Sequence, residues 1–400
     1  MELNLTYRPL RTDDIDQYND LLRYSFQITE QDLAESGWKN DEIKQSKFPV
    51  LDRADVIGCF DGQTLASQFA VYPLKMNIYG QVYAVGFVTS VCTYPEYSGK
   101  GIMKQLMYRS LAHMRSKHEP FALLYPYSIP LYRRRGWEII SNKISYIVKD
   151  RQITSSVNAP GMVHRVEWDD QAFMNLHNTF AQTTHGCLFR NSIAWEEYWR
   201  WEKDDTFVAV YYDTNHSPQG YMVYLVEADK MYIKEMIYLN REAQEGLWKY
   251  IREHDSMIDE VHGDSYCDES IAFEMDDADI KETIHPYIMG RIVDVEMFFE
   301  KYGCRKNAPR TVVSFAVEDN LLEWNNGAFR VLFENGICTP TEEEPDIELS
   351  LSIGSLTTML IGYKRAAELH RIGRIKGSLS DMERLDEVLL HKIPYISDYI

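Results

Sequence analysis

The sequence lacks any long apolar run. No segment approaches the roughly 18 apolar residues that a membrane-spanning helix needs, and residues 1–14 are polar, without the apolar core of a signal peptide. These two absences predict a cytoplasmic protein with no membrane partner.

Positive charge is also scarce. The chain has 42 Lys and Arg residues against 61 Asp and Glu residues, for a net charge of −19, and only Arg133, Arg134 and Arg135 form a basic run. A polyanion would be repelled by such a field. The composition therefore argues against a nucleic-acid partner, and it suits a cationic or amine substrate.

Cysteines are few and scattered. The six stand at positions 59, 92, 187, 267, 304 and 338, with no CxxC pair and no His cluster nearby. This spacing predicts reduced core thiols rather than disulfides, and no metal site. Cys92 is a weak candidate for a nucleophile, because no base lies near it in the sequence.

With 400 residues, the chain is too long for one ordinary core. In residues 1–150, Thr12–Asp14 can cap a helix that runs through Leu21–Phe26. Strands are expected at Asp55–Phe60, Thr64–Leu74 and Gln81–Thr93, with a turn at Gly62 between the first two.

A polar, turn-forming stretch over 151–170 predicts a boundary, after which the same order of elements begins again. The expected elements are helices at Phe173–Phe180 and Ile193–Trp201, strands at Phe207–Tyr212, Gly220–Glu227 and Met231–Tyr238, and a helix at Arg241–Ile251. The junction Met236–Glu242 has no glycine and carries an acid, so it would repel a phosphate.

After Tyr287–Asp294 the composition of the chain changes again, which predicts a third unit. Short strands are expected at Thr311–Asp319, Leu321–Asn325, Phe329–Phe333 and Ile347–Ser352, with turns at Asn326-Gly327 and Asn335-Gly336. Helices are expected at Ser355–Tyr363, Ala366–Ile372 and Asp381–His391.

The segment Val88–Met103 is the most informative part of the chain. A strand-type run enters a turn that holds Gly99 and Gly101, and Lys104–Leu111 has helical spacing. Amide N–H groups in such a turn can point at an anion, and the helix adds the positive end of its dipole. Many strand-to-helix turns contain glycine for steric reasons alone, so the turn by itself is weak evidence.

This segment resembles the acetyl-coenzyme A loop of the GNAT acetyltransferases, where a Pro-x-Tyr-Arg-Gly-x-Gly run follows the central strand. Ser98 replaces the Arg of that pattern, and Met103 replaces a small residue. The resemblance implies that acetyl-coenzyme A is the donor and that its pyrophosphate is bound mainly by backbone amides. The residues implied in cofactor binding are Val91, Cys92 and Thr93 on the strand, Ser98, Gly99, Lys100, Gly101, Ile102, Met103 and Lys104 in the loop, and Tyr127 and Ser128 further on.

A second element, Tyr132 to Trp137, resembles the Tyr-x-x-x-Gly-aromatic element of the same family. The resemblance implies that Tyr132 protonates the departing coenzyme A thiolate. The alternative is a tyrosine that only packs its ring, as is expected of most of the 27 tyrosines in the chain.

The run at 349–377 resembles the sterol carrier protein fold. The whole chain then resembles the Eis family of amine acetyltransferases, with an α/β (α+β) fold class. Two tandem GNAT-like mixed-sheet domains are expected at 1–150, with the cofactor loop, and at 151–286, degenerate, followed by a sterol-carrier-like domain at 287–400. This resemblance implies a homohexamer whose C-terminal carboxylate, on Ile400, is a catalytic group in the first domain.

Acetyl transfer to an amine needs a base, because an ammonium of pKa ~10.4 is neutral in only about one molecule in 2,500 at pH 7. The resemblance nominates the carboxylate of Ile400, and His113, His118 and His185 are alternatives. The expected activity is direct N-acetylation of an aminoglycoside, a polyamine or a lysine-like amine. A non-catalytic acetyl-coenzyme A sensor, suggested by Ser98 and Met103, and a lipid carrier, opposed by the acidic run at 342–344, are alternatives.

Overall fold

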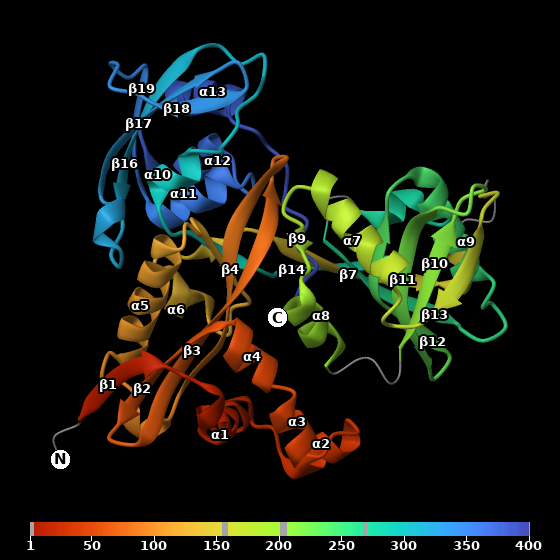
Figure 1. The fold of residues 1–400 in the computed structure, drawn as a ribbon. Coiled ribbons are helices and arrows are strands. Elements are labelled where there is room, and N and C mark those ends of the chain that lie inside the picture. The colour runs from red at the N-terminus through yellow and green to blue at the C-terminus, as the bar shows by residue number, and fades with distance from the viewer. Residues whose placement is uncertain (1–3, 154–158, 201–205, 267–269, 400) are drawn as a thin grey trace.

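The computed structural model describes residues 4–153, 159–200, 206–266 and 270–399. Three separate β-sheets of eight, seven and five strands organise these residues, and helices cover each sheet (Figure 1). The α/β architecture in three units that the sequence predicts is confirmed. Among the described residues, no helix is long and apolar enough to cross a membrane.

The first sheet has the strand order β1-β2-β3-β4-β5-β15-β6, and β9 pairs with β3. Its long central hairpin, β3 and β4, turns at Tyr79 and Gly80, which both have positive φ; Gly62 turns the chain between β2 and β3 as predicted, with φ +62°. The strands are β1 (Leu5–Pro9), β2 (Asp55–Asp61), β3 (Thr64–Ile78), β4 (Gln81–Thr93), β5 (Phe121–Leu124), β6 (Glu138–Ile139), β9 (Leu188–Phe189) and β15 (Met289–Ile292). The helices are α1 (Ile15–Phe26), α2 (Glu30–Glu35), α3 (Asn40–Gln45), α4 (Phe48–Arg53), α5 (Ile102–Ser116) and α6 (Ile129–Arg133).

The second sheet has the order β14-β7-β13-β12-β11-β10-β8. Its strands are β7 (Asn142–Lys149), β8 (Met162–Val166), β10 (Phe207–Tyr212), β11 (Pro218–Glu227), β12 (Lys230–Tyr238), β13 (Glu260–Ser265) and β14 (Lys281–Pro286), and its helices are α7 (Gln171–Thr183), α8 (Ser192–Trp199) and α9 (Arg241–Arg252). Helix α8 matches the expected helix from Ile193 to Trp199, and Arg200 caps its C-terminal end. Trp201 lies outside the described residues.

The first two units exchange strands near both expected boundaries. Strand β7 precedes residue 150 in the chain but pairs with β13 and β14 of the second sheet. Strand β15 follows residue 286 but lies between β5 and β6 of the first sheet. All four residues of β15 are buried, which explains why this strand sits inside a sheet rather than at its edge.

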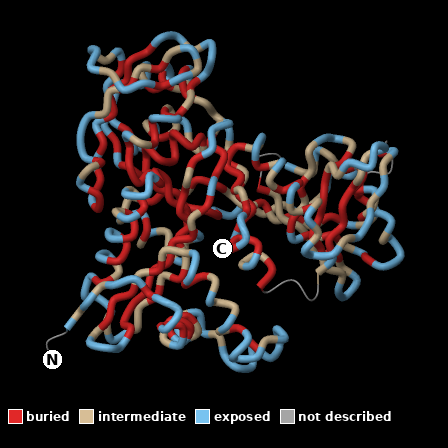
Figure 2. The backbone as a smooth tube through the Cα atoms, viewed as in Figure 1, coloured by how far each residue is buried: buried red, intermediate tan, exposed pale blue. Residues whose placement is uncertain are grey.

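The C-terminal unit has a sheet of order β18-β17-β16-β19-β20. Its strands are β16 (Thr311–Glu318), β17 (Gly327–Glu334), β18 (Ile337–Pro340), β19 (Ile347–Ser352) and β20 (Ile375–Lys376), and its helices are α10 (Val295–Phe299), α11 (Ile353–Leu360), α12 (Ala366–Arg371) and α13 (Leu379–Val388). Phe299, Phe315 and Phe333 pack ring to ring in its interior, with centroids 5.6 to 6.4 Å apart. One cluster of buried residues joins this unit to the first sheet, and Figure 2 shows buried residues in red where the two meet.

The expected strand at Leu321–Asn325 is wrong. These residues form a loop and a short 3-10 helix, Glu323–Asn325, because the buried carboxylate of Asp319 accepts hydrogen bonds from the backbone N–H groups of Leu321 and Leu322. Asp319 is also ion-paired with Arg291 of β15, and both side chains are fully buried. In this sheet the sequence analysis missed β18, which follows the correctly expected turn at Asn335 and Gly336, and the two-residue strand β20.

Candidate active site

The candidate site lies where strands β4 and β5 separate. The two strands are parallel neighbours from Val85–Val88 and Phe121–Leu124; β5 then ends, while β4 continues to Thr93. The β3–β4 register shifts in the same stretch, and Ser90 has φ +53°. Backbone groups of β4 beyond Val88 therefore face the gap that β5 leaves, where an extended ligand can pair with them.

The glycine loop has the open geometry that a phosphate requires. Gly99 and Gly101 have φ of +75° and +76°, and nothing lies within 4 Å of the position of a Cβ atom at either residue. The loop leads into α5, whose first-turn amides have no partner within the helix. Ser98, Lys100 and Lys104 are exposed at the rim. Ile102 is buried, and Met103 packs against the same core cluster, so neither side chain obstructs the loop.

The residues expected along β4 are held by the neighbouring strand. The hydroxyl groups of Ser67 and Thr93 lie 2.7 Å apart, and Ser67 Oγ donates to the carbonyl of Cys92 at 2.8 Å. Burial raises the pKa of the Cys92 thiol to about 12, so this thiol stays protonated at neutral pH and cannot act as a nucleophile. Val91 is half-buried in the region of the register shift.

Tyr132 lies on α6 with only 5% of its surface exposed. Burial, and to a smaller extent Cys92, raise the pKa of its phenol to about 12. A phenol with this pKa keeps its proton at neutral pH and can donate it to a thiolate in the gap. Tyr127 is 96% exposed, and Ser128 is the residue that precedes the first turn of α6.

The C-terminal tail, residues 390–399, reaches the same gap. The backbone N–H of Tyr395 donates to the carbonyl of His185 at 2.9 Å, and Ile396 is fully buried. The ring of Tyr399 packs edge-on against Tyr125, with centroids 5.0 Å apart. Tyr125 directly follows β5, so the tail ends beside the separation of β4 and β5. Ile400 lies outside the described residues.

The histidines considered as bases have other positions. His185 Nδ1 accepts from the backbone N–H of Tyr79 at 3.0 Å, and its Nε2 lies 2.9 Å from the carbonyl of Ile361. Burial lowers the pKa of this imidazole to about 4. His185 thus joins the three units as a neutral structural group, and the alternative of a catalytic base there is wrong. His113 is exposed beside Asp55, and His118 follows the end of α5.

The sequence analysis missed a group of buried polar side chains behind the gap. Tyr18 of α1 has its hydroxyl 3.0 Å from Ser90 Oγ. The amide of Gln68 donates to the backbone carbonyl of Tyr18 at 3.4 Å. Nearby, the Tyr72 hydroxyl donates to Glu197 of α8 at 3.0 Å. No local spacing could reveal these contacts, because Tyr18 and Ser90 are 72 residues apart.

The counterpart of the glycine loop in the second unit is closed to anions. At the start of α9, the side chain of Asn240 accepts from the backbone N–H of Ala243 at 2.9 Å. The carboxylate of Glu242 lies in the first turn and accepts from the Tyr211 hydroxyl at 2.6 Å. A phosphate there would meet a negative charge and an amide that already has a partner.

Gly101→Asp is expected to weaken acetyl-coenzyme A binding about tenfold or more. The new carboxylate would oppose the helix dipole and the phosphates, at a cost of about 1–2 kcal/mol. Isothermal titration calorimetry measures the affinity. Gly37→Asp is the matched control, since Gly37 also has a positive φ of +74° and open space around it. Ser98→Arg should tighten binding, and an unchanged affinity for a folded Gly101→Asp protein would remove the loop from the site.

Comparisons with known proteins agree with this geometry. Residues 6–140 match a family described as an acetyltransferase (GNAT) domain, residues 186–292 match a second family of the same description, and residues 295–397 match a sterol carrier protein domain. A Streptomyces avermitilis protein named as an uncharacterized N-acetyltransferase is 21% identical over 378 residues, which cover 86% of this chain and 89% of that protein.

Solved structures share the fold over the full length. An Enterococcus faecalis protein described as a probable N-acyltransferase has a TM-score of 0.90 at 24% identity and covers 100% of both chains. Eis1 from Mycobacterium abscessus has a TM-score of 0.82 at 18% identity and covers 99% of this chain and 100% of its own. With two GNAT acetyltransferase domains followed by a sterol carrier protein domain, the chain is a GNAT-type acyltransferase whose arrangement of domains and fold are Eis-like.

Proposed function

We propose that the first GNAT unit transfers the acetyl group of acetyl-coenzyme A directly to a primary amine of an aminoglycoside, a polyamine or a lysine-like acceptor. The observation that carries this proposal is the position of the tail, whose Tyr399 packs against Tyr125 where β4 and β5 separate. The resemblance to the Eis family implies that the terminal carboxylate, here on Ile400, enters that site. A carboxylate beside the thioester attracts an ammonium group, so it favours an amine over an uncharged acceptor.

In the proposed mechanism, the Ile400 carboxylate holds the ammonium and accepts its proton, directly or through a water. Since a free α-carboxyl has a pKa of ~3.5, it is a weak base and acts mainly by positioning. The amine nitrogen then attacks the thioester carbonyl, a C–N bond forms as the C–S bond breaks, and the nitrogen releases its second proton to water as it becomes an amide. Backbone N–H groups at Val91–Thr93 hold the carbonyl, and Tyr132 gives its proton to the departing sulfur.

Direct attack predicts sequential kinetics. Double-reciprocal plots at several amine concentrations should intersect, because both substrates must be bound before any product leaves. Parallel lines, together with an acetylated protein in the mass spectrum, would indicate a covalent intermediate instead. Cys92→Ala is expected to retain most of the turnover, since the buried thiol of Cys92 is protonated at neutral pH.

We further propose a homohexamer located in the cytoplasm. The hexamer is implied by the Eis-like arrangement, and sedimentation velocity at micromolar concentration tests it: a monomeric species at all concentrations would contradict it. The cytoplasmic location is supported by the cysteines, since Cys59, Cys92, Cys187, Cys304 and Cys338 are all buried free thiols. Cys267 lies outside the described residues.

A further inference from the structure

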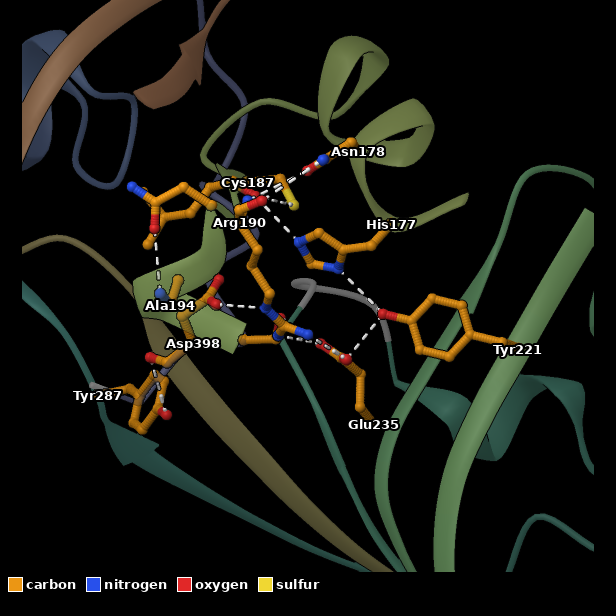
Figure 3. A network of polar contacts seen from close by, with 12 residues as sticks. His177, Asn178, Cys187, Arg190, Ala194, Tyr221, Glu235, Tyr287 and Asp398 are labelled. Atoms are coloured by element: carbon orange, nitrogen blue, oxygen red, sulfur yellow. Dashed lines mark hydrogen bonds and ion pairs between the residues drawn. The ribbon is translucent and has the colours of Figure 1, made fainter. Parts of the chain in front are cut away.

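A buried ion cluster joins the tail to the second unit. Arg190 binds Glu235 through two hydrogen bonds of 2.8 and 2.7 Å, and its Nε donates to Asp398 Oδ1 at 2.7 Å (Figure 3). None of these side chains is more than 3% exposed. The three charges come from three separate elements: Arg190 follows β9, Glu235 lies on β12, and Asp398 is two residues from the end of the chain.

The surrounding side chains hold this cluster in one geometry. The Tyr221 hydroxyl donates to Glu235 Oε2 at 2.8 Å, and His177 Nδ1 lies 2.9 Å from the same hydroxyl. Ser397 Oγ donates to Glu235 Oε1 at 2.8 Å, so two successive residues of the tail are bonded to the cluster. The guanidinium of Arg190 also lies 4.7 Å from the ring centre of Trp195. Charge-assisted and bidentate contacts of this kind fix orientation as well as position.

Glu235 occupies the place in the second unit that corresponds to the thioester-binding segment of the first. Strands β12 and β13 are parallel neighbours only from Lys230–Ile233 and Glu260–Gly263. The β11–β12 register then shifts so that Val223 pairs with Glu235 and Tyr224 with Ile233. Strand β4 has the same two features in the same order: parallel pairing with β5, then a register shift, and then Val91–Thr93.

The tail passes through both of these gaps in turn. Lys392, Ile393 and Tyr395 line a cavity of about 280 Å³ with Tyr238 of β12 and Ser265 of β13. The chain then makes its contacts with Arg190 and Glu235, and Tyr287 donates from its hydroxyl to the backbone carbonyl of Asp398 at 3.3 Å. Tyr399, the last residue that the structure describes, packs against Tyr125 in the first unit.

We infer that the second GNAT unit positions the catalytic end of the chain: Arg190, oriented by Glu235, binds Asp398 and thereby fixes Tyr399 and the terminal carboxylate in the site of the first unit. This inference rests on the proposed function of the carboxylate. Arg190, Glu235 and Asp398 are positioning residues, since they act through the two residues that follow them. The gap that holds substrate in the first unit thus holds the protein's own tail in the second.

Asp398→Ala tests the inference. The substitution leaves Arg190 paired with Glu235, so the two charges that remain buried balance each other and the fold should persist. Release of the tail should lower kcat for amine acetylation about 10- to 100-fold, because an error of about 1 Å in the placement of a catalytic group can cost a factor of about 10². The KM for acetyl-coenzyme A should change less than about twofold, and amide hydrogen exchange should become faster at residues 395–399.

Two further variants complete the experiment. Asp398→Asn keeps an oxygen that can accept from Arg190 Nε, so its kcat should lie between those of Asp398→Ala and the parent protein. Glu387→Ala is the matched control, because it removes a carboxylate from an exposed position of α13 and should change neither kcat nor tail exchange.

A protein without Tyr399 and Ile400, measured beside these variants, distinguishes the positioning role of Asp398 from the catalytic role of the terminal carboxylate. If the deletion abolishes turnover while Asp398→Ala retains the parent kcat and tail exchange, the positioning role is wrong and the catalytic carboxylate stands. If Asp398→Ala lowers kcat without faster exchange in the tail, the cluster does not hold the tail and the inference is also overturned. If the deletion leaves turnover intact, the catalytic role of the Ile400 carboxylate is wrong, and the inference fails with it, while acetyl transfer to the amine stands.

Discussion

Appending a short tag after Ile400 is expected to abolish acetyl transfer, with kcat lower by about 10²–10⁴, the range of a lost acid–base group. The tag moves the terminal carboxylate away from the site where Tyr399 meets Tyr125. Deletion of Tyr399 and Ile400 should have the same effect. Turnover is measured as thiol release from acetyl-coenzyme A with a saturating amine.

Acetyl-coenzyme A binding and assembly should be nearly unchanged in the tagged protein, because the glycine loop at Ser98–Gly101 lies at the start of α5, whereas Tyr399 packs against Tyr125 after β5. Chain ends ordinarily tolerate additions, so the same tag on the N-terminus is the control and should be harmless. Full turnover by the C-terminally tagged protein would exclude the carboxylate. A bound water would then be the remaining candidate for the base, since both ring nitrogens of His185 already have partners.

Tyr132→Phe is expected to lower kcat by about 10²–10⁴, the second large effect. The substitution keeps the buried ring, which packs edge-on against Trp137 with centroids 6.2 Å apart, and removes only the hydroxyl. The fold and the acetyl-coenzyme A affinity should therefore persist. Tyr108→Phe, on the exposed side of α5 at 39% exposure, is the matched control. A turnover within a few-fold of the parent for every amine tested would show that Tyr132 is not the acid.

The pH profile gives a second test of Tyr132. Burial raises the pKa of this phenol to about 12, so it stays protonated, and able to donate, until the pH approaches that value. The rate should therefore show no loss from phenol ionisation between pH 7 and 10. An alkaline limb with a midpoint near pH 10 that disappears in Tyr132→Phe would mean that the phenol is not buried as described.

The order of the three units could be predicted because it depends on local patterns. Runs of apolar, β-branched and aromatic residues predict β3 and β4, and glycine turns such as Gly62 mark where strands reverse. The exchange of β7, β9 and β15 between the first two sheets could not be predicted. Strand β9 has only two residues, and its Phe189 pairs with Lys75 of β3. A strand this short, with a partner more than 100 residues away, leaves no pattern in the local sequence.

The loop of the candidate site could be predicted from local spacing, because Gly99 and Gly101 are two residues apart and their positive φ angles are properties of a short turn. The buried polar groups could not, because they meet only in three dimensions. Asp398, for example, is separated by 208 residues from Arg190. Its position near the end of a chain gave no signal either, since charged residues close to a terminus are usually solvated.

The most direct test of the central claim is acetyl transfer by the purified protein to a panel of primary amines. Acetyl-coenzyme A is mixed with aminoglycosides, polyamines and free lysine, and thiol release is followed together with the mass of each amine. We predict release of coenzyme A in step with the appearance of an N-acetylated amine for at least one class. Tight acetyl-coenzyme A binding with no acetylated product from any amine would contradict the account and favour a sensor.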